Sequence, residues 1–431
     1  MARPTVQKNR GISDAVLNIP ESATHGTAAK IAALNTSLPE DEQIIDLSIG
    51  ALDTPTDPRI DRGVIEFVEK NSETIHAFAP IKGFPFLLAS VAARVARLHK
   101  ITYDPDREIM VTPGGVKGSI SVAFHALLNP GDEVVIPVPN WPHYSDMVRL
   151  HEAVPKTVLV TAQDGLTAPA LDGALSARTK FVVLGDCINP TGKVYSTEEL
   201  SALAEVVARH NVRRESCGES PVYVLFDTPY EAHIVGARAT TFAALDVPLP
   251  DGGRCSMRQW TLSVTGPGKT YGMHGDRIGY LCGPSDIVDA AARAQVNITS
   301  FASTYGQVAT HLALQPEMDE VADARAKAAR THLQAMLREL EAVPALKIVP
   351  PQGGYFLFVD LSGYAHAYQK HGYGSAEQFL LEEAKVATIC GSHFAEGHSQ
   401  HHFVRINCGR TAAVVSTAGI RIRRALARLE S

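Results

Sequence analysis

Short apolar runs alternate with amphipathic stretches between about residues 108 and 283. The runs are rich in Val, Ile, Leu and aromatic residues, and they cover Glu133–Pro137, Lys180–Leu184, Val222–Asp227, Gln259–Val264 and Ile278–Cys282. Between them, Ser196–His210 opens with Ser-Thr-Glu-Glu, which is a helix-start signature. Apolar strands separated by helices are typical of a mostly parallel sheet covered on both faces. We therefore expect an α/β fold, a three-layer sandwich around a mostly parallel central sheet.

The pattern changes from about residue 315 onward. A polar helix pattern covers Met318–Glu341, and it is followed by a β-like run at Gly354–Leu361, a helix near 375–385, a β-like run at Phe403–Ile406 and a closing helix at Thr417–Leu429. This mixture predicts a smaller α+β domain. We expect a large domain of residues 50–314 and a small domain formed by 1–49 and 315–431. The segments near 211–221 and 247–254 are expected to be surface loops.

Bulk composition narrows the class of protein. The chain has 431 residues, of which 45% are hydrophobic and 20% charged, as in soluble globular proteins. Its net charge of −6 gives no reason to expect nucleic acid or a membrane surface as a partner, and no apolar run approaches the ~18 residues of a membrane span. Six well-separated cysteines and an N-terminus without an apolar stretch favour a cytoplasmic protein with reduced thiols.

The run from 263 to 280 carries the most specific chemistry. A β-like run ends in Gly-Pro-Gly, Lys269 follows at once, and Arg277 comes eight residues later. A lysine fixed on a tight turn suits a Schiff base with an aldehyde, and an arginine at a fixed offset suits a phosphate. Together they suggest the phosphorylated aldehyde cofactor pyridoxal phosphate. The alternative is a surface turn with two ordinary charges.

Five other positions could complete such a site. Gly114 and Gly115 open a helical stretch, whose exposed N–H groups would suit a phosphate. Trp141, on a turn braced by prolines, could stack on a flat ring. Asn189 could donate to a phenolate oxygen, and Asp227, at the end of an apolar run, could pair with a protonated ring nitrogen. For each of these an ordinary turn, packed aromatic or helix cap is the alternative.

Arg405 lies inside the apolar run Phe403–Ile406 and therefore needs an anionic partner. A substrate carboxylate would be a good bidentate partner. A structural ion pair with a nearby carboxylate is the alternative.

The order and spacing of these pieces resemble fold-type I pyridoxal-phosphate enzymes, and specifically the class I/II aminotransferase (aspartate aminotransferase) superfamily. The resemblance covers nearly the whole chain. It includes Ile45–Gly50, Gly83–Pro85, Asn129–Val134 and Pro351–Phe356 as well as the positions above.

The resemblance implies a role for each matching residue. Lys269 would form the Schiff base and move the proton, and Asp227 would pair with the pyridine nitrogen. Asn189 and Tyr230 would bind the phenolic oxygen, and Trp141 would stack on the ring. The phosphate would be surrounded by Gly114, Gly115, Val116 and Arg277, whereas Arg405 would hold the substrate α-carboxylate and Gly50 would line the substrate end. The family is usually dimeric, so we also expect a homodimer with shared active sites.

Some positions depart from the family pattern. Three expected phosphate-binding hydroxyls are replaced, at Gly266, Val116 and Phe78, while Lys117 could supply compensating charge. His274 and Asp276 stand where small or apolar residues are usual, as substrate contacts or as surface residues. The histidines at 393, 398, 401 and 402 have no carboxylate or cysteine at ligand spacing, so no metal site is predicted.

We expect a pyridoxal-phosphate-dependent aminotransferase of amino acid metabolism or biosynthesis that acts on an α-amino acid. The altered phosphate site keeps a rival open, namely a lyase, cyclase or carbon–carbon bond-forming enzyme of specialised biosynthesis on the same fold. A transcription regulator built on this fold would need a DNA-binding extension, and only about 40 residues precede Ile45. The sequence specifies neither the substrate side chain nor the amino acceptor.

Overall fold

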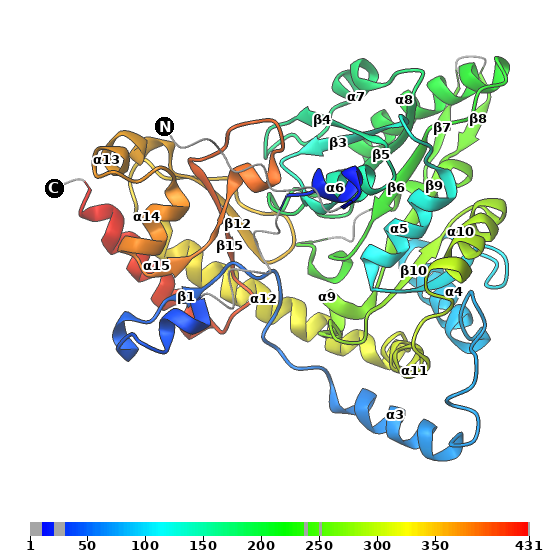
Figure 1. The fold of residues 1–431 in the computed structure, drawn as a ribbon, viewed down its shortest axis with the longest axis horizontal. Helices are drawn as coiled ribbons and strands as arrows, with labels where there is room; N and C mark the ends of the chain where they lie inside the picture. Colours follow the sequence, from blue (N-terminus) through cyan, green and yellow to red (C-terminus); the bar gives the residue numbers. More distant parts are fainter. Residues whose placement is uncertain (1–10, 21–30, 237–239, 250–251, 430–431) are drawn as a thin grey trace.

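A computed structural model describes residues 11–20, 31–236, 240–249 and 252–429. It has two lobes that are bridged by the long helix α12 (Asp319–Leu340), which runs beneath both in Figure 1. Ala322 near the start of α12 packs in the core of the larger lobe, whereas Leu333 and Met336 pack in the core of the smaller lobe.

The larger lobe is built on a seven-stranded sheet. Its strands, in spatial order, are β2 (Ile109–Pro113), β10 (Ile278–Cys282), β9 (Thr261–Thr265), β6 (Tyr223–Asp227), β5 (Thr179–Gly185), β3 (Glu133–Val138) and β4 (Val154–Leu159). The strand β10 runs antiparallel to both of its neighbours, and the other pairs are parallel. The predicted mostly parallel sheet is therefore confirmed.

Helices cover both faces of this sheet, which gives the expected three layers. On one face lie α5 (Val116–Leu127), α6 (His143–Leu150) and α10 (Ser285–Ile298), and on the other lie α4 (Pro85–His99), α7 (Ala168–Ala174), α8 (Thr197–Ser216) and α11 (Thr304–Ala313). Along β3, Val134 and Ile136 pack into the first layer and Val135 into the second. Each such side chain contributes about 1.5–3 kcal/mol by burial, so strands covered twice read as continuous apolar runs.

The smaller lobe contains an antiparallel sheet in the order β11 (Lys347–Ile348), β12 (Phe356–Asp360), β15 (Phe403–Asn407) and β14 (Ile389–Cys390). The helices α13 (Ala365–Lys370), α14 (Ala376–Glu383) and α15 (Ala412–Ala427) belong to this lobe. Strand β1 (Ile45–Asp46) pairs in parallel with β13 (Val386–Ala387). That pairing supports our proposal that residues 1–49 and 315–431 form one domain and 50–314 the other.

Among the described residues, regular structure extends into both of the expected surface loops. The helix α8, opened by the predicted capping box of Ser196 and Glu199, continues to Ser216. The buried Asn211 holds the helix end in place, because its side-chain amide bonds both the N–H and the carbonyl of Val222. The segment near 247–254 contributes to a hairpin of β7 (Asp246–Pro248) and β8 (Arg254–Ser256), whose Val247 and Cys255 are buried.

Three further helices, α1, α3 and α9, pack against or follow elements of the larger lobe. The four-residue helix α1 (Asp14–Leu17) contacts α6, α3 (Pro58–Lys70) packs on α11, and α9 (Pro267–Tyr271) follows β9. Along the described ranges, no helix combines the length and the apolar character that a membrane crossing requires.

Candidate active site

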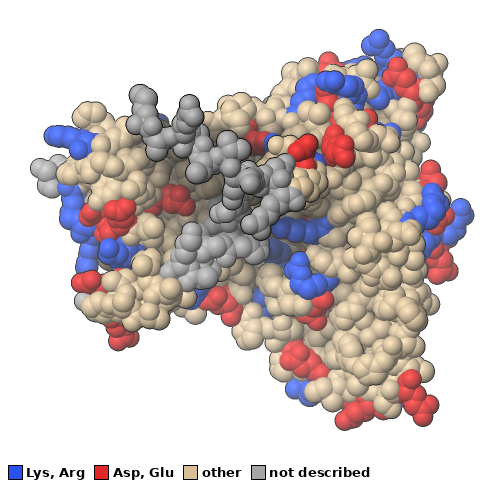
Figure 2. Space-filling model, in the orientation of Figure 1, with Lys and Arg blue, Asp and Glu red and all other residues tan. Residues whose placement is uncertain are grey.

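One edge of the large sheet gathers the predicted site residues. The parallel strands β2, β3, β5, β6 and β9 all end there, and the antiparallel β10 begins there. The residues that come at or just after those ends, or just before β10, are Gly114, Gly115, Trp141, Asn189, Asp227, Lys269 and Arg277. Ligands of such sheets bind at this edge. In Figure 2 a hollow opens between the two lobes, and Lys and Arg side chains lie within it.

Lys269 lies on the short helix α9, which Gly266 and Pro267 start directly after β9. Its Nζ donates a hydrogen bond to the carbonyl of Gly50. Burial, together with the positive charge of Arg405, lowers the pKa of this amine to about 8, although Asp227 acts in the opposite direction. The amine therefore exchanges protons near neutral pH, as a catalytic base must.

The main chain of Lys269 is held by His233, a residue that the sequence did not single out. The His233 Nε2 lies 3.2 Å from the carbonyl oxygen of Lys269. Burial lowers the pKa of this imidazole to about 4, so it is neutral at physiological pH. A neutral ring with Nε2 protonated can donate to the carbonyl, which fixes the helix that carries the lysine.

Asp227 ends β6 and is almost fully buried. One oxygen, Oδ2, accepts a hydrogen bond of 2.5 Å from the hydroxyl of Tyr144. The other, Oδ1, has no partner among the described residues. Burial raises the pKa of the carboxyl to about 7, against the effects of Tyr144 and Lys269. A buried carboxylate oxygen without a hydrogen bond destabilises the folded protein unless a ligand donates a hydrogen bond to it.

Tyr144, on the first turn of α6, was also missed as a site residue. Its ring packs edge-on against Trp141, with centroids 5.1 Å apart. A second buried acid, Asp186, follows β5 beside Asp227. Burial and the neighbouring Asp227 raise the pKa of Asp186 well above its usual range.

Arg405 reaches the site from β15 of the smaller lobe and is 3% exposed. Its guanidinium donates to the carbonyl of Ser48 (2.5 Å) and to Oδ1 of Asn189 (3.1 Å). It also lies over the rings of Phe356 and Phe394, 4.7 and 5.0 Å from their centroids. Within the described ranges no carboxylate forms an ion pair with it, so the structural ion pair considered from sequence is not present there. Burial lowers its pKa to about 10, which leaves the group charged and open to an anion.

An anion cradle lies at the start of α5. Gly114 and Gly115 adopt φ of 84° and 71°, which favours glycine, and the N–H groups of the first helical turn follow. The guanidinium of Arg277 closes over this turn and donates to the carbonyl of Gly114 at 2.7 Å. A Cβ on Gly115 would lie 3.5 Å from that guanidinium, an ordinary contact distance, so the positive φ and not a lack of space favours glycine there. The ammonium of Lys117 lies 5.3 Å from the centroid of Trp141.

Packing explains why the expected hydroxyl is missing at Gly266. A Cβ there would lie 2.7 Å from the carbonyl oxygen of Ile278, so a serine does not fit this backbone. The same Cβ would lie 3.4 Å from Val116, which places two of the replaced positions side by side. Thr265 is no substitute, since its hydroxyl donates to the carbonyl of Thr228 at 2.8 Å.

The other predicted positions differ in how deeply they are buried. Tyr230 is buried, with its ring centroid 5.8 Å from those of Tyr355 and Phe356. Phe78 stands apart from the buried group, because it is 92% exposed. His274 is half-buried and burial lowers its pKa to about 4, while burial raises the pKa of Asp276; both precede Arg277 in the loop to β10.

Comparison with known proteins gives the family. The family Aminotransferase class I and II matches residues 42–422. The chain belongs to this family. An aspartate aminotransferase of Bacillus sp. (strain YM-2) is 31% identical to this aminotransferase over 357 residues, which cover 81% of the chain and 84% of the relative. An asparagine–oxo-acid transaminase of Streptococcus mutans is 28% identical over 389 residues, covering 89% of the chain and 92% of that protein.

Solved structures agree with this assignment. The aspartate aminotransferase of Rhizobium meliloti superposes with a TM-score of 0.83 at 29% identity, covering 96% of this chain and 98% of its own. The chain is thus an enzyme, a class I/II aminotransferase, and the predicted fold is confirmed.

The lowered pKa of Lys269 can be measured on cofactor-free protein. Only the neutral amine reacts with acetic anhydride, so labelling of Lys269 should reach half its maximum near pH 8. Trace labelling from pH 6 to 11, read peptide by peptide by mass spectrometry, measures this. The other lysines in the same samples serve as internal references. A midpoint near the ordinary lysine value of ~10.4 would contradict the environment described for this amine.

The bond from Tyr144 to Asp227 predicts a stability loss. Tyr144→Phe removes the one hydrogen bond to a buried carboxylate, so urea unfolding of cofactor-free protein at pH 8 should show about 1–3 kcal/mol less stability. Tyr223→Phe, which removes a half-buried hydroxyl that has no hydrogen-bond partner among the described residues, is the matched control and should stay close to wild type. Equal stability of both variants would mean that the bond does not stabilise the fold.

Proposed function

We propose that this aminotransferase uses pyridoxal phosphate to move the amino group of an α-amino acid to a 2-oxo acid. One observation carries the proposal beyond family membership. Asp227 keeps one buried carboxylate oxygen without a hydrogen-bond partner among the described residues, and it lies close enough to Lys269 for each to shift the pKa of the other. The protonated ring nitrogen of the cofactor is a donor that would complete that oxygen.

The residues present fit the cofactor at each of its ends. Asp227 would bind the ring nitrogen, and Trp141 would pack on the ring. Asn189, whose Oδ1 is already occupied by Arg405, keeps its amide N–H groups for the phenolic oxygen, with Tyr230 beside it. The N-terminus of α5 with Gly114, Gly115 and Val116, and the guanidinium of Arg277, would hold the phosphate.

Bound there, the cofactor supplies an aldehyde carbon that takes the amino group and a ring that stores electrons. The chain's own residues bind the substrate and move the proton. Arg405 holds the α-carboxylate, since it is buried, charged and without a carboxylate partner in the described chain. The Nζ of Lys269, with its pKa of about 8, takes the α-proton and returns it. Gly50 keeps this space open, because a Cβ there would lie 3.3 Å from Phe356.

Positive charge offsets the missing hydroxyls of the phosphate cradle. Lys117 and Arg277 are close enough that Arg277 contributes to lowering the pKa of Lys117, after burial. A phosphate dianion beside both would relieve that repulsion. Because Gly266 is required by packing against Ile278, its missing hydroxyl no longer argues for the lyase or cyclase reading. We therefore propose transamination alone.

Transamination can be tested directly. The purified protein, mixed with single amino acids and no acceptor, should convert the cofactor's visible absorption to that of its amine form and release the 2-oxo acid. Absorption spectra and mass spectrometry of the products measure both. Lys269→Ala should retain no cofactor after borohydride reduction, and Asp227→Asn should lose at least about 100-fold in kcat, the scale typical of a key electrostatic contact. Loss of a leaving group from the amino acid, with no amine form, would contradict the proposal.

We also propose that the enzyme is a cytoplasmic homodimer. Among the described residues all six cysteines are free thiols, which suits a reducing compartment. Phe78 is 92% exposed and packs edge-on against Phe301, and Ile298 and Tyr305 nearby in the chain are 51% and 39% exposed. Large apolar side chains that gather on a surface are typical of an interface with another chain.

The dimer proposal predicts a change in mass. Phe78→Glu should shift the protein from dimer towards monomer in sedimentation equilibrium at micromolar concentration, because a charge would be buried in the interface. Val349→Glu, at a 39% exposed apolar position of the smaller lobe, is the control and should leave the mass unchanged. A monomeric wild type, or a dimeric Phe78→Glu variant, would argue against this interface.

A further inference from the structure

A buried arginine connects two segments of the active site from the sheet face that α4 covers. Arg94, on α4, is 2% exposed. Its Nε and Nη2 donate to Oε1 of Glu231 at 3.2 and 2.6 Å. Its Nη1 donates to the hydroxyl of Tyr271 at 2.8 Å and to Oδ1 of Asp319 at 3.3 Å. All three guanidinium nitrogens therefore have partners within the chain.

Two of these partners stand next to predicted site residues. Glu231 follows Tyr230 directly and opens a short 3-10 turn. This turn ends at His233, whose ring contacts the carbonyl of Lys269. Tyr271 is the last residue of α9, two residues after Lys269. One guanidinium thus links the segment that carries Tyr230 to the helix that carries the lysine.

The helix α9 depends on such contacts, because it has only five residues. Isolated helices shorter than ~12–15 residues are marginal in water, so tertiary contacts must hold this one. It begins after Gly266 and ends at Gly272, whose φ of 78° is typical of a helix end. The hydrogen bond from Arg94 to the Tyr271 hydroxyl therefore anchors the end of the turn that bears Lys269.

The carboxylate of Glu231 balances the buried positive charge. Its second oxygen, Oε2, lies 3.1 Å from Nε2 of His99, which is also on α4. Burial acts to raise the pKa of Glu231, but Arg94 and His99 outweigh it and hold this pKa well below its usual range. Apolar residues of similar volume often stabilise a fold as well as a buried ion pair does. Stability alone therefore does not account for this arrangement.

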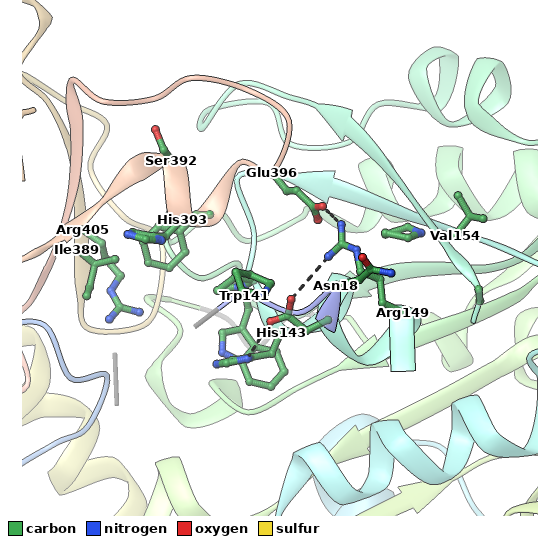
Figure 3. Close-up of a pocket in the computed structure, with 16 residues that line it drawn as sticks. Asn18, Trp141, His143, Arg149, Val154, Ile389, Ser392, His393, Glu396 and Arg405 are labelled. Atoms are coloured by element: carbon green, nitrogen blue, oxygen red, sulfur yellow. Dashed lines mark ion pairs between the residues drawn. The ribbon is translucent and has the colours of Figure 1, made fainter. Parts of the chain in front are cut away.

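The network lies apart from the open cavity of the site. A cavity of about 570 Å³ reaches Arg405 between the two lobes. Figure 3 shows Trp141 near its middle and Arg149 beside Glu396 at its far side. Arg94 does not line this cavity; it lines a separate space of about 30 Å³. Substitutions of the arginine therefore leave the wall around Arg405 unchanged.

We propose that Arg94 is a positioning residue, which fixes the helix of Lys269 relative to Tyr230. It acts through the side chains of Glu231 and Tyr271. A misplacement of 1 Å at a reacting group can lower a rate by about 100-fold, so a guanidinium that holds two site segments at once supports turnover. This inference rests on the proposed function and adds a residue to it.

The hydroxyl of Tyr271 allows a test that spares the ion pair. Tyr271→Phe removes the hydrogen bond from Arg94 and keeps the pairing with Glu231. With α9 held less firmly, the Nζ of Lys269 should gain access to water. The midpoint of its labelling should then rise from near pH 8 by about one pH unit, towards the ordinary value of ~10.4. Trace acetylation of cofactor-free protein, read by mass spectrometry, measures this midpoint.

Arg97→Gln is the matched control for that measurement. Arg97 lies three residues further along α4 and pairs with Asp319 at 3.1 Å, at the partly exposed end of the network. This variant also loses an ion pair, but it should keep the wild-type midpoint of Lys269. An unchanged midpoint in Tyr271→Phe, or an equal shift in Arg97→Gln, would overturn the proposal.

Arg94→Lys gives a second readout on the cofactor-loaded enzyme. A lysine keeps the charge but lacks the planar fork that serves three partners. Its kcat should fall by at least about tenfold, because the reacting groups lose their fixed geometry. The KM for the amino acid should stay within about twofold of wild type, since the wall around Arg405 is unchanged. An unchanged kcat, or a loss confined to KM, would overturn the proposal.

The two readouts separate this role from the proposed function. A wild-type enzyme that turns over no amino acid would count against the proposed function, and the labelling of Tyr271→Phe would still test the role of Arg94. If Arg94→Lys does not fold, as circular dichroism would show, the same labelling decides the proposal.

Discussion

The buried carboxylate of Asp227 is the constraint on which the site depends. It stands at the end of a central strand, shielded from water. One oxygen accepts a hydrogen bond from Tyr144, and the other has no donor in the part of the chain that the structure describes. Such a group is tolerated only where the surrounding fold holds it in place and a ligand completes it. The sheet supplies this support, because parallel strands covered on both faces bring several chain segments to one rigid edge. The lysine and the anion cradle are placed by the same edge.

Electrostatics then divide the site into parts with different tasks. Burial brings the acid and the amine, Asp227 and Lys269, towards neutral pH from opposite directions. At the smaller lobe, Arg405 stays charged because carbonyl oxygens and ring faces surround it in place of a carboxylate. Farther out, Arg149 is neutralised by two acids. Among the described residues, Arg405 therefore remains available to a ligand anion, whereas Arg149 does not.

Sequence patterns predicted the elements that are buried on both faces and the residues that follow them. The strand Ile278–Cys282 has the predicted bounds, whereas the run at Gln259–Val264 begins late because Met257–Trp260 forms a 3-10 turn. Lys269, Asp227 and Arg405 could be found because each interrupts an apolar or turn pattern. Tyr144 and His233 could not, since each acts on a partner more than 30 residues away. The sequence also could not show why position 266 is a glycine, because the atom that excludes a side chain there belongs to the next strand, β10.

The long helix α12 limits how the two lobes can move. Its 22 residues span about 33 Å at 1.5 Å per residue, with one end locked in each core. In the second turn of the helix, Arg325 donates to the carbonyls of Thr54 and Pro55, in the segment that follows Gly50. Sliding of one lobe along the other would break one of these cores. The cleft can therefore change width only by pivoting or flexing about α12, and the hydrogen bond from Arg405 of the smaller lobe to Asn189 of the larger lobe would report that motion directly.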